Sequence, residues 1–186
     1  MAAHAHGAAG INAALEAGVD SIEHGSFLDD RSLELFIEKG AFHVPTIIAG
    51  VTALEMAGAG NVLSPAQIGK AQTVGLKIKE ALARSYKAGA NIAFGTDMGV
   101  GPHGQNAREF RFMTEAGMTA QDAIKAATVN AAKLLDIIDD AGTIAPGKFA
   151  DIIAVDSSPL EDVAVLERVS FVMARGSVYR RAFSLP

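Results

Sequence analysis

Three residues that suit a divalent metal occupy matching places in the sequence, at or just after the end of a short apolar segment. They are His4, His24 and Asp97. Parallel strands point their carboxyl ends to one edge of a sheet, so the three side chains are expected to converge there. Imidazole nitrogens and a carboxylate are suitable ligands for zinc. Taken alone, Asp97 is equally well explained as a cap of the turn, and each histidine is better explained as a satisfied polar residue at a strand end. Taken together, the three residues predict a metal site.

Two other histidines receive different predictions. His103 lies in the glycine-rich loop 98–105 after Asp97, where it would lie over the mouth of the site and contact substrate. The alternative for His103 is a solvated side chain on a flexible loop. His43 lies within an apolar segment rather than at its end, which indicates a packed side chain. Three charged residues on the helix expected after the loop are predicted to form a solvated face with i,i+3 pairing: Arg108, Glu109 and Arg111.

The composition indicates a globular chain. Of its 186 residues, 49% are hydrophobic and 20% are charged, which allows a core and argues against disorder. The net charge of -5 and the scattered basic residues disfavour nucleic-acid binding through a basic patch. The absence of cysteine excludes disulfides and thiolate metal ligands. No apolar run is long enough to span a bilayer, and a cytoplasmic location is expected if no targeting signal lies upstream of Met1.

The segments that must position the candidate ligands alternate between strand and helix. Strands are predicted at residues 2–6, 19–23, 41–48 and 92–94, with helices at 8–17, 30–40, 65–87, 106–116 and 119–127. Such strand–helix units favour a parallel sheet with helices packed outside it. The strands are short and apolar, as expected when both faces of a sheet are covered. Residues 49–64 are predicted to be a long loop, and long loops in compact domains are often functional.

Capping residues give the helix boundaries. Asp29 or Asp30 is expected to cap the second helix, which ends at Gly40. That helix should bury one face, formed by Leu33, Phe36 and Ile37. The longest helix is expected to open at Pro65 and to end at Gly89. Thr119 is expected to cap the helix at residues 119–127.

The pattern changes near Gly142. Residues 150–155 and 169–174 are predicted strands, and Arg175-Gly176-Ser177 is a tight turn into another strand. No amphipathic helix of comparable length lies between them. We therefore predict an α/β domain at residues 1–141 and a small β module at residues 142–186.

Several motifs resemble the C-terminal half of the metal-dependent amidohydrolase superfamily. They are HAHG at the start, SIEHG around His24, FGTDMGVGPHGQNAREF around Asp97 and GTIAPGKFADIIAVD near the end. Their order and spacing are similar to those of the imidazolonepropionase-like and Xaa-Pro dipeptidase-like (prolidase-like) branch. The resemblance covers essentially the whole chain, and the Asp97 motif and the closing motif are each fairly specific.

The resemblance implies the C-terminal half of a (β/α)8 TIM barrel plus part of a small β-sandwich. For the full-length enzyme it implies a binuclear centre of divalent metal, with zinc the first choice. Carried over by motif, His4 is the fifth-strand ligand with His6 as second choice, His24 the sixth-strand ligand and Asp97 the eighth-strand ligand. His6 is otherwise assigned, with His103, to substrate binding. His4-Ala5-His6 is followed by the fifth-strand context, and the sequence has neither a first-strand His-x-His upstream of it nor a candidate fourth-strand lysine, so it looks like a fragment that begins at barrel strand five.

The implied activity is hydrolysis of a C–N bond in a dipeptide or N-acyl amino acid by metal-activated hydroxide. Asp97 would accept the proton of the attacking water and pass it to the leaving nitrogen. A cyclic amidase, an imidazolonepropionase-like hydrolase or a deaminase is the alternative enzyme class. A truncated half barrel without activity is the alternative outside enzymes. The open sheet edges of a half barrel predict a macromolecular partner, either another copy of the chain or the missing N-terminal half.

Overall fold

The computed structural model describes residues 1–58 and 65–182, which contain a parallel and an antiparallel sheet. The parallel sheet has four strands in chain order: β1 (Ala2–Gly7), β2 (Ser21–Phe27), β3 (Phe42–Val44) and β4 (Asn91–Ile92). The antiparallel sheet has three strands: β5 (Ile152–Ala154), β6 (Phe171–Ala174) and β7 (Ser177–Arg181). The predicted parallel α/β sheet is therefore confirmed.

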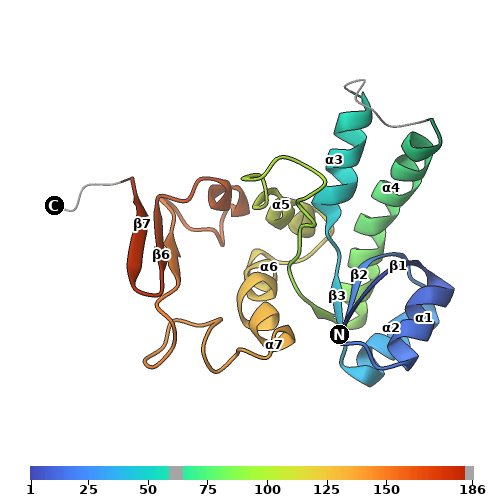
Figure 1. Ribbon diagram of the computed structural model, residues 1–186, viewed down its shortest axis with the longest axis horizontal. Helices are drawn as coiled ribbons and strands as arrows, with labels where there is room; N and C mark the ends of the chain where they lie inside the picture. Colours follow the sequence, from blue (N-terminus) through green and yellow to red (C-terminus); the bar gives the residue numbers. More distant parts are fainter. Residues whose placement is uncertain (59–64, 183–186) are drawn as a thin grey trace.

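Helices follow each strand of the parallel sheet. Those between its strands are α1 (Ala8–Glu16), α2 (Asp30–Lys39), α3 (Ile47–Gly58) and α4 (Pro65–Ala88). After β4 come α5 (Arg108–Glu115), α6 (Ala120–Lys125), the π-helical turn η1 (Ala126–Asn130) and α7 (Ala131–Leu134), and the 3-10 helix η2 (Val163–Glu167) lies between β5 and β6. The antiparallel sheet lies at the opposite end of the molecule from α1 and α2 (Figure 1). Among the helices described, none is both long and apolar enough to cross a membrane.

The described apolar side chains gather in two cores. One core packs α1 and α2 against the first strands through buried residues that include Ile11, Leu15, Ile22, Leu35 and Phe36. The other packs α3, α4, α5 and α6 together through buried residues that include Ile48, Ile78, Leu82, Met113 and Ala123. Both cores lie on the helix-covered side of the parallel sheet, so its helices are anchored there and its other face is left for the site.

Helix α2 begins where its sequence predicts and buries two of the three residues predicted for its inner face. Asp29 caps the helix by accepting a hydrogen bond from the Ser32 N–H at 2.8 Å, and Gly40 ends it in a left-handed conformation (φ 66°). The prediction of Ile37 in the buried face is wrong, because its side chain is 54% exposed. Phe36 is buried and Leu33 packs half-buried against the core, as predicted, and Ser32 and Leu35 are buried as well.

The segment after β3 is helical, which corrects two predictions. The strand predicted at residues 41–48 ends at Val44, because Pro45 lacks an N–H and Thr46 has a left-handed backbone (φ 50°). Helix α3 then covers most of the loop predicted at residues 49–64, and residues 59–64 lie outside the described part of the chain. The apolar residues of α3 are not confined to one face, so the sequence shows little helical periodicity. Gly50 allows the close approach of α4, since a Cβ there would lie 3.1 Å from the Gly75 Cα.

The predicted positions of the remaining helices, strands and turns agree more closely with the structure. Helix α4 begins at Pro65 and Gly89 follows its end, as expected. The apolar run 92–94 contributes only Ile92 to β4, although the Ala93 N–H still donates to the His43 carbonyl oxygen on β3 at 3.1 Å. In the antiparallel sheet, the predicted turn at Arg175-Gly176 joins β6 to β7. The division of the chain at residue 142 stays a prediction.

Candidate metal centre

The two histidines of β1 point to the face of the sheet opposite the helices. Side chains alternate along a strand, and Ala3 and Ala5 pack against the core formed with α1 and α2. His4 and His6 therefore lie on the other face, where His4 is exposed and His6 half-buried. Spacing by two residues places both imidazoles side by side, with ring centroids 4.9 Å apart.

His24 joins them because β2 is irregular at this point. By simple alternation His24 would share the helix-covered face with Ile22. Instead His24 (φ 73°) and Gly25 (φ 60°) are both left-handed, and the register of β2 against β1 shifts just beyond this point. Only glycine fits after His24, because a Cβ at position 25 would lie 2.7 Å from His43 Nε2. The bulge turns the His24 ring toward β1.

The three imidazoles form a compact group of possible metal ligands. His24 Nε2 lies 2.8 Å from His4 Nδ1, and His6 stacks on His24 with ring centroids 4.8 Å apart. One nitrogen from each of the three residues lies within 4.8 Å of the others. Hydroxyl groups orient two of these rings: His24 Nδ1 lies 2.7 Å from Thr46 Oγ1, and His6 Nδ1 lies 2.8 Å from Ser26 Oγ.

The protonation state of His24 suits a metal ligand. Burial, followed by the neighbouring imidazoles of His6 and His4, lowers the pKa of His24 from 6.5 to about 4. His24 is therefore neutral at pH 7, and neutral imidazole is the form that binds metal. Nitrogen donors at this separation, with hydroxyl groups fixing the outer nitrogens, fit a divalent ion such as zinc.

Asp97 lies near this group but is not one of its three members. The residue is exposed and left-handed (φ 48°), and it ends the segment that follows β4. Its negative charge opposes the lowered pKa of His24 and contributes to the raised pKa of Glu23. The segment is held by the π-helical turn, since the Phe94 N–H donates to the Ala126 carbonyl oxygen at 3.0 Å. The Asn130 amide also donates to the Ile92 carbonyl oxygen at 2.8 Å.

The other candidate substrate residue, His103, is exposed on the loop after Asp97. It does not belong to the histidine group. The loop is connected to the site through Asn106, whose amide donates to Thr96 Oγ1 at 3.1 Å. The same Asn106 side chain accepts a hydrogen bond from the Gly104 N–H at 3.3 Å. The loop thus begins and ends close to Asp97.

Two polar residues of the site were missed by the sequence reasoning. Glu23 pairs with His4 in the register of β1 and β2, and burial raises its pKa even though the Ser21 hydroxyl donates to it at 2.6 Å. Thr46 is buried and contacts His24. Glu23 could have been found from its place directly before His24 in SIEHG. Thr46 carried no such signal, because its role depends on the left-handed turn after Pro45.

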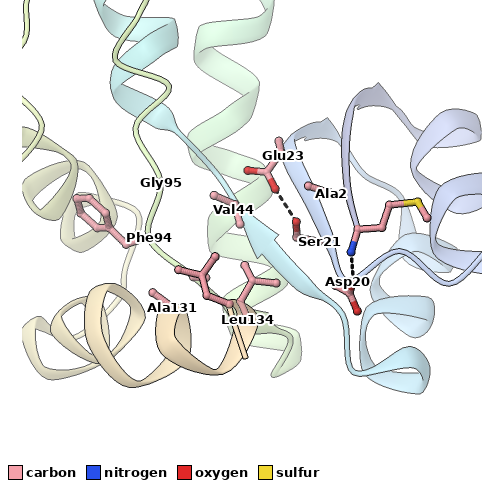
Figure 2. A pocket seen from close by; sticks show the side chains of 12 residues that line it. Ala2, Asp20, Ser21, Glu23, Val44, Phe94, Gly95, Ala131 and Leu134 are labelled. Carbon is pink, nitrogen blue, oxygen red and sulfur yellow. Dashed lines mark hydrogen bonds and ion pairs between the residues drawn. The ribbon is translucent and has the colours of Figure 1, made fainter. Parts of the chain in front are cut away.

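A cavity of about 510 Å³ extends from Glu23 toward the amino ends of the strands. Figure 2 shows Glu23 and Ser21 joined by their hydrogen bond on its wall, with Val44 of β3 beside them. Most of the other lining residues are apolar: Met1, Ala2, Ala93, Phe94, Gly95, Ala131, Leu134 and Leu135. The polar group of histidines therefore adjoins an apolar hollow on the same face of the sheet.

Several known proteins are similar to this chain in sequence or structure. The crystal structure of a Xaa-Pro dipeptidase with methionine bound in its active site superposes with a TM-score of 0.92 and 47% identity, over 96% of this chain and 44% of that one. Ochratoxinase from Aspergillus niger is 38% identical over 187 residues, which cover 97% of this chain and 38% of that protein. Imidazolonepropionase from Deinococcus deserti is 32% identical over 135 residues, or 70% of this chain and 33% of that protein. The chain thus spans less than half the length of each relative.

A family profile gives the same result for nearly the whole sequence. The profile described as the amidohydrolase family matches residues 1–179. This range includes the histidine group, Asp97 and most of both sheets. The chain belongs to the amidohydrolase family.

Proposed function

We propose that this chain is part of a metal-dependent hydrolase that cleaves the C–N bond of a dipeptide or N-acyl amino acid. The observation that carries the proposal is the convergence of His4 and His24, whose Nδ1 and Nε2 atoms lie 2.8 Å apart near the charge of Asp97. The amidohydrolase relatives support the reaction class, and the dipeptidase and ochratoxinase support an amide substrate.

We further propose that residues 1–141 are the C-terminal half of a (β/α)8 barrel and that residues 142–186 contribute to a small β-sandwich. The open edges of β1 and β4 and the greater length of the relatives support this view. A complete barrel would add four strands and cover the apolar hollow next to Glu23. The second half would also supply the remaining ligands of a binuclear centre. By itself, this chain would bind metal weakly, turn over poorly and associate with another polypeptide.

His4, His24 and Asp97 would hold the metal, with His6 as an alternative ligand on β1. The bound metal would act as a Lewis acid that polarises the scissile carbonyl and lowers the pKa of the attacking water. The Asp97 carboxylate would take the proton of this water and return it to the leaving nitrogen. Its exposed position at the carboxyl end of the sheet leaves it accessible to substrate. His6 and His103 would contact the substrate on either side of Asp97.

A cyclic amide is the second candidate substrate class, because imidazolonepropionase is among the relatives. The test is a panel of Xaa-Pro dipeptides, N-acyl amino acids and cyclic amides, offered to a full-length parent reconstituted with Zn²⁺ or Co²⁺. The expected result is hydrolysis of the acyclic amides that is lost in Asp97→Asn. Asp156→Asn, in the antiparallel-sheet region, is the matched control and should retain activity. Unchanged turnover in Asp97→Asn would eliminate the role given to Asp97, and turnover of the cyclic amides alone would favour the second class.

A further inference from the structure

Glu109 is a buried acidic residue that the proposed reaction does not use. It lies in the first turn of α5, and its side chain is 0% exposed. The sequence predicts a solvated face for Arg108, Glu109 and Arg111, and for Glu109 this prediction is wrong. A buried carboxyl group needs hydrogen-bond partners, because leaving it unpaired is unfavourable. Its partners therefore indicate why it is there.

Both oxygens of Glu109 accept hydrogen bonds from the first turn of α3. Oε1 lies 2.9 Å from the Ile47 N and Oε2 lies 2.7 Å from the Ile48 N. The first N–H groups of a helix have no partner within it, and a carboxyl group there also interacts well with the helix dipole. The cap of α3 thus comes from another helix, 61 residues further along the chain.

The reason for this distant cap lies in Thr46, the residue directly before α3. A threonine at this position would ordinarily cap its own helix with its hydroxyl, as Asp29 does with its carboxylate for α2. The Thr46 hydroxyl is instead 2.7 Å from His24 Nδ1. If His24 Nε2 binds metal, Nδ1 carries the proton, and this N–H donates a hydrogen bond to Thr46 Oγ1, which fixes the tautomer and the ring plane.

Thr46 needs external support to stay in this place. Its side chain is buried, and its backbone is left-handed (φ 50°), which is uncommon for a β-branched residue. Such a conformation persists only where the surroundings determine it. The two hydrogen bonds that Glu109 accepts fix Ile47 and Ile48, which immediately follow Thr46. Because α5 follows the Asp97 loop, Glu109 also connects that loop to His24.

We infer that Glu109 is a positioning residue for the metal centre: it caps α3 in place of Thr46 and thereby holds the Thr46 hydroxyl against His24. The inference rests on the proposed function only in naming His24 a metal ligand. Its geometric part, the control of the His24 ring by Glu109 through Thr46, applies to the metal-free chain as well.

The test uses the purified chain and three single variants. Glu109→Gln keeps the size of the side chain but presents an NH₂ group to one of the two backbone N–H groups. Thr46→Val removes the hydroxyl at constant shape. Arg108→Gln is the matched control, because Arg108 on the same helix pairs with Glu55 of α3 at 2.7 Å without touching Thr46. Glu109→Asp, which keeps the carboxyl group and shortens its reach, replaces Glu109→Gln if that variant does not fold.

The first readout is the pair of His24 ring ¹⁵N chemical shifts in the metal-free chain. Glu109→Gln and Thr46→Val should both move them and change the tautomer ratio, while Arg108→Gln should leave them as in the parent. The second readout is Co²⁺ affinity, which should weaken about 10- to 100-fold in both variants, the size typical for loss of an outer-shell partner. The double variant should be no weaker than Thr46→Val alone, because both changes act through one contact.

The outcomes distinguish a failure of the positioning role of Glu109 from a failure of the proposed metal function. If Glu109→Gln moves the His24 shifts no more than Arg108→Gln does, Glu109 is merely a helix cap and the inference fails. Additive losses of Co²⁺ affinity in the double variant would overturn it as well. If the shifts move as expected but the parent chain and the full-length parent bind no Co²⁺, the inference holds and the proposed metal function fails.

Discussion

The His43 ring donates a hydrogen bond from Nε2 to the backbone carbonyl oxygen of His24 on the neighbouring strand, at 3.0 Å. This direction follows because a carbonyl oxygen can only accept, and the Ser85 hydroxyl of α4, 2.7 Å from Nδ1, is then the donor to His43. Burial lowers the pKa of His43 from 6.5 to about 4, so the ring is neutral at pH 7. His43 thus fixes the irregular backbone that turns His24 toward His4.

Replacing His43 by leucine should destabilise the chain strongly. The substitution leaves the His24 carbonyl oxygen without its ring donor, and an unsatisfied buried group costs about 1–3 kcal/mol. The Ser85 hydroxyl keeps the Leu82 carbonyl oxygen, 3.1 Å away, as an acceptor. We expect the free energy of unfolding in urea to fall by roughly 1–3 kcal/mol. Ser85→Ala, which removes only one of the two bonds, is the control and should lose about 1 kcal/mol. A His43→Leu variant as stable as the parent would show that the two bonds contribute nothing.

Gly25→Ala should distort the metal centre. The new methyl group would lie 2.7 Å from His43 Nε2, and the backbone there is left-handed (φ 60°). Gly18→Ala is a matched control, because Gly18 is also left-handed (φ 84°) but a methyl group at that position would meet no atom within 4 Å. We expect Gly18→Ala to lose about 1 kcal/mol of unfolding free energy and Gly25→Ala to lose clearly more. Equal losses, measured by urea denaturation, would mean that the contact with His43 is easily relieved.

Much of the helical frame was predictable from the sequence, whereas the geometry that completes the site was not. Asp29 and Gly40 bound α2 and Pro65 opens α4 because capping chemistry is local. His4 and His24 were paired because strand ends of a parallel sheet share an edge. The left-handed turn at His24 and the change from strand to helix at Thr46 depend on contacts with distant residues, so no local sequence pattern predicts them.

The misjudgement of Glu109 has the same physical origin. Its neighbour Arg108 does form an ion pair, with Glu55 of α3. Glu109 points the other way, into the contact between α5 and α3, where two backbone N–H groups compensate its burial. A charged residue next to other charged residues on a helix normally faces solvent. Only the position of α3, which was itself predicted as a loop, shows that a partner exists.

Glu109 should make the stability of the chain depend on pH. Burial raises its pKa from 4.5 to about 7 against the lowering effect of the Ile48 and Ile47 N–H groups. The folded state therefore holds this proton more tightly than the unfolded state. The stabilisation that the protonated Glu109 side chain gives to the folded state is fully present below pH 4.5 and is lost as the pH rises through about 7.

Glu109→Gln measures this contribution, because glutamine does not titrate. Urea denaturation of parent and variant at several pH values between about 4.5 and about 8 should show the parent losing on the order of 3 kcal/mol relative to the variant. A difference that stays constant across this range would contradict the raised pKa of Glu109.

Metal that binds the histidine group should stabilise the folded chain, more so the tighter it binds. A ligand that binds only the folded state adds about 2.7 kcal/mol when its free concentration is about 100 times Kd. We expect Zn²⁺ to raise the melting temperature of the chain and excess chelator to reverse the rise. His24→Gln should abolish the effect, since it removes the nitrogen 2.8 Å from His4 Nδ1. His103→Gln, in the exposed loop outside the histidine group, should keep it. An equal Zn²⁺ effect in both variants would place the bound ion elsewhere on the chain and remove the support for His24 as a ligand.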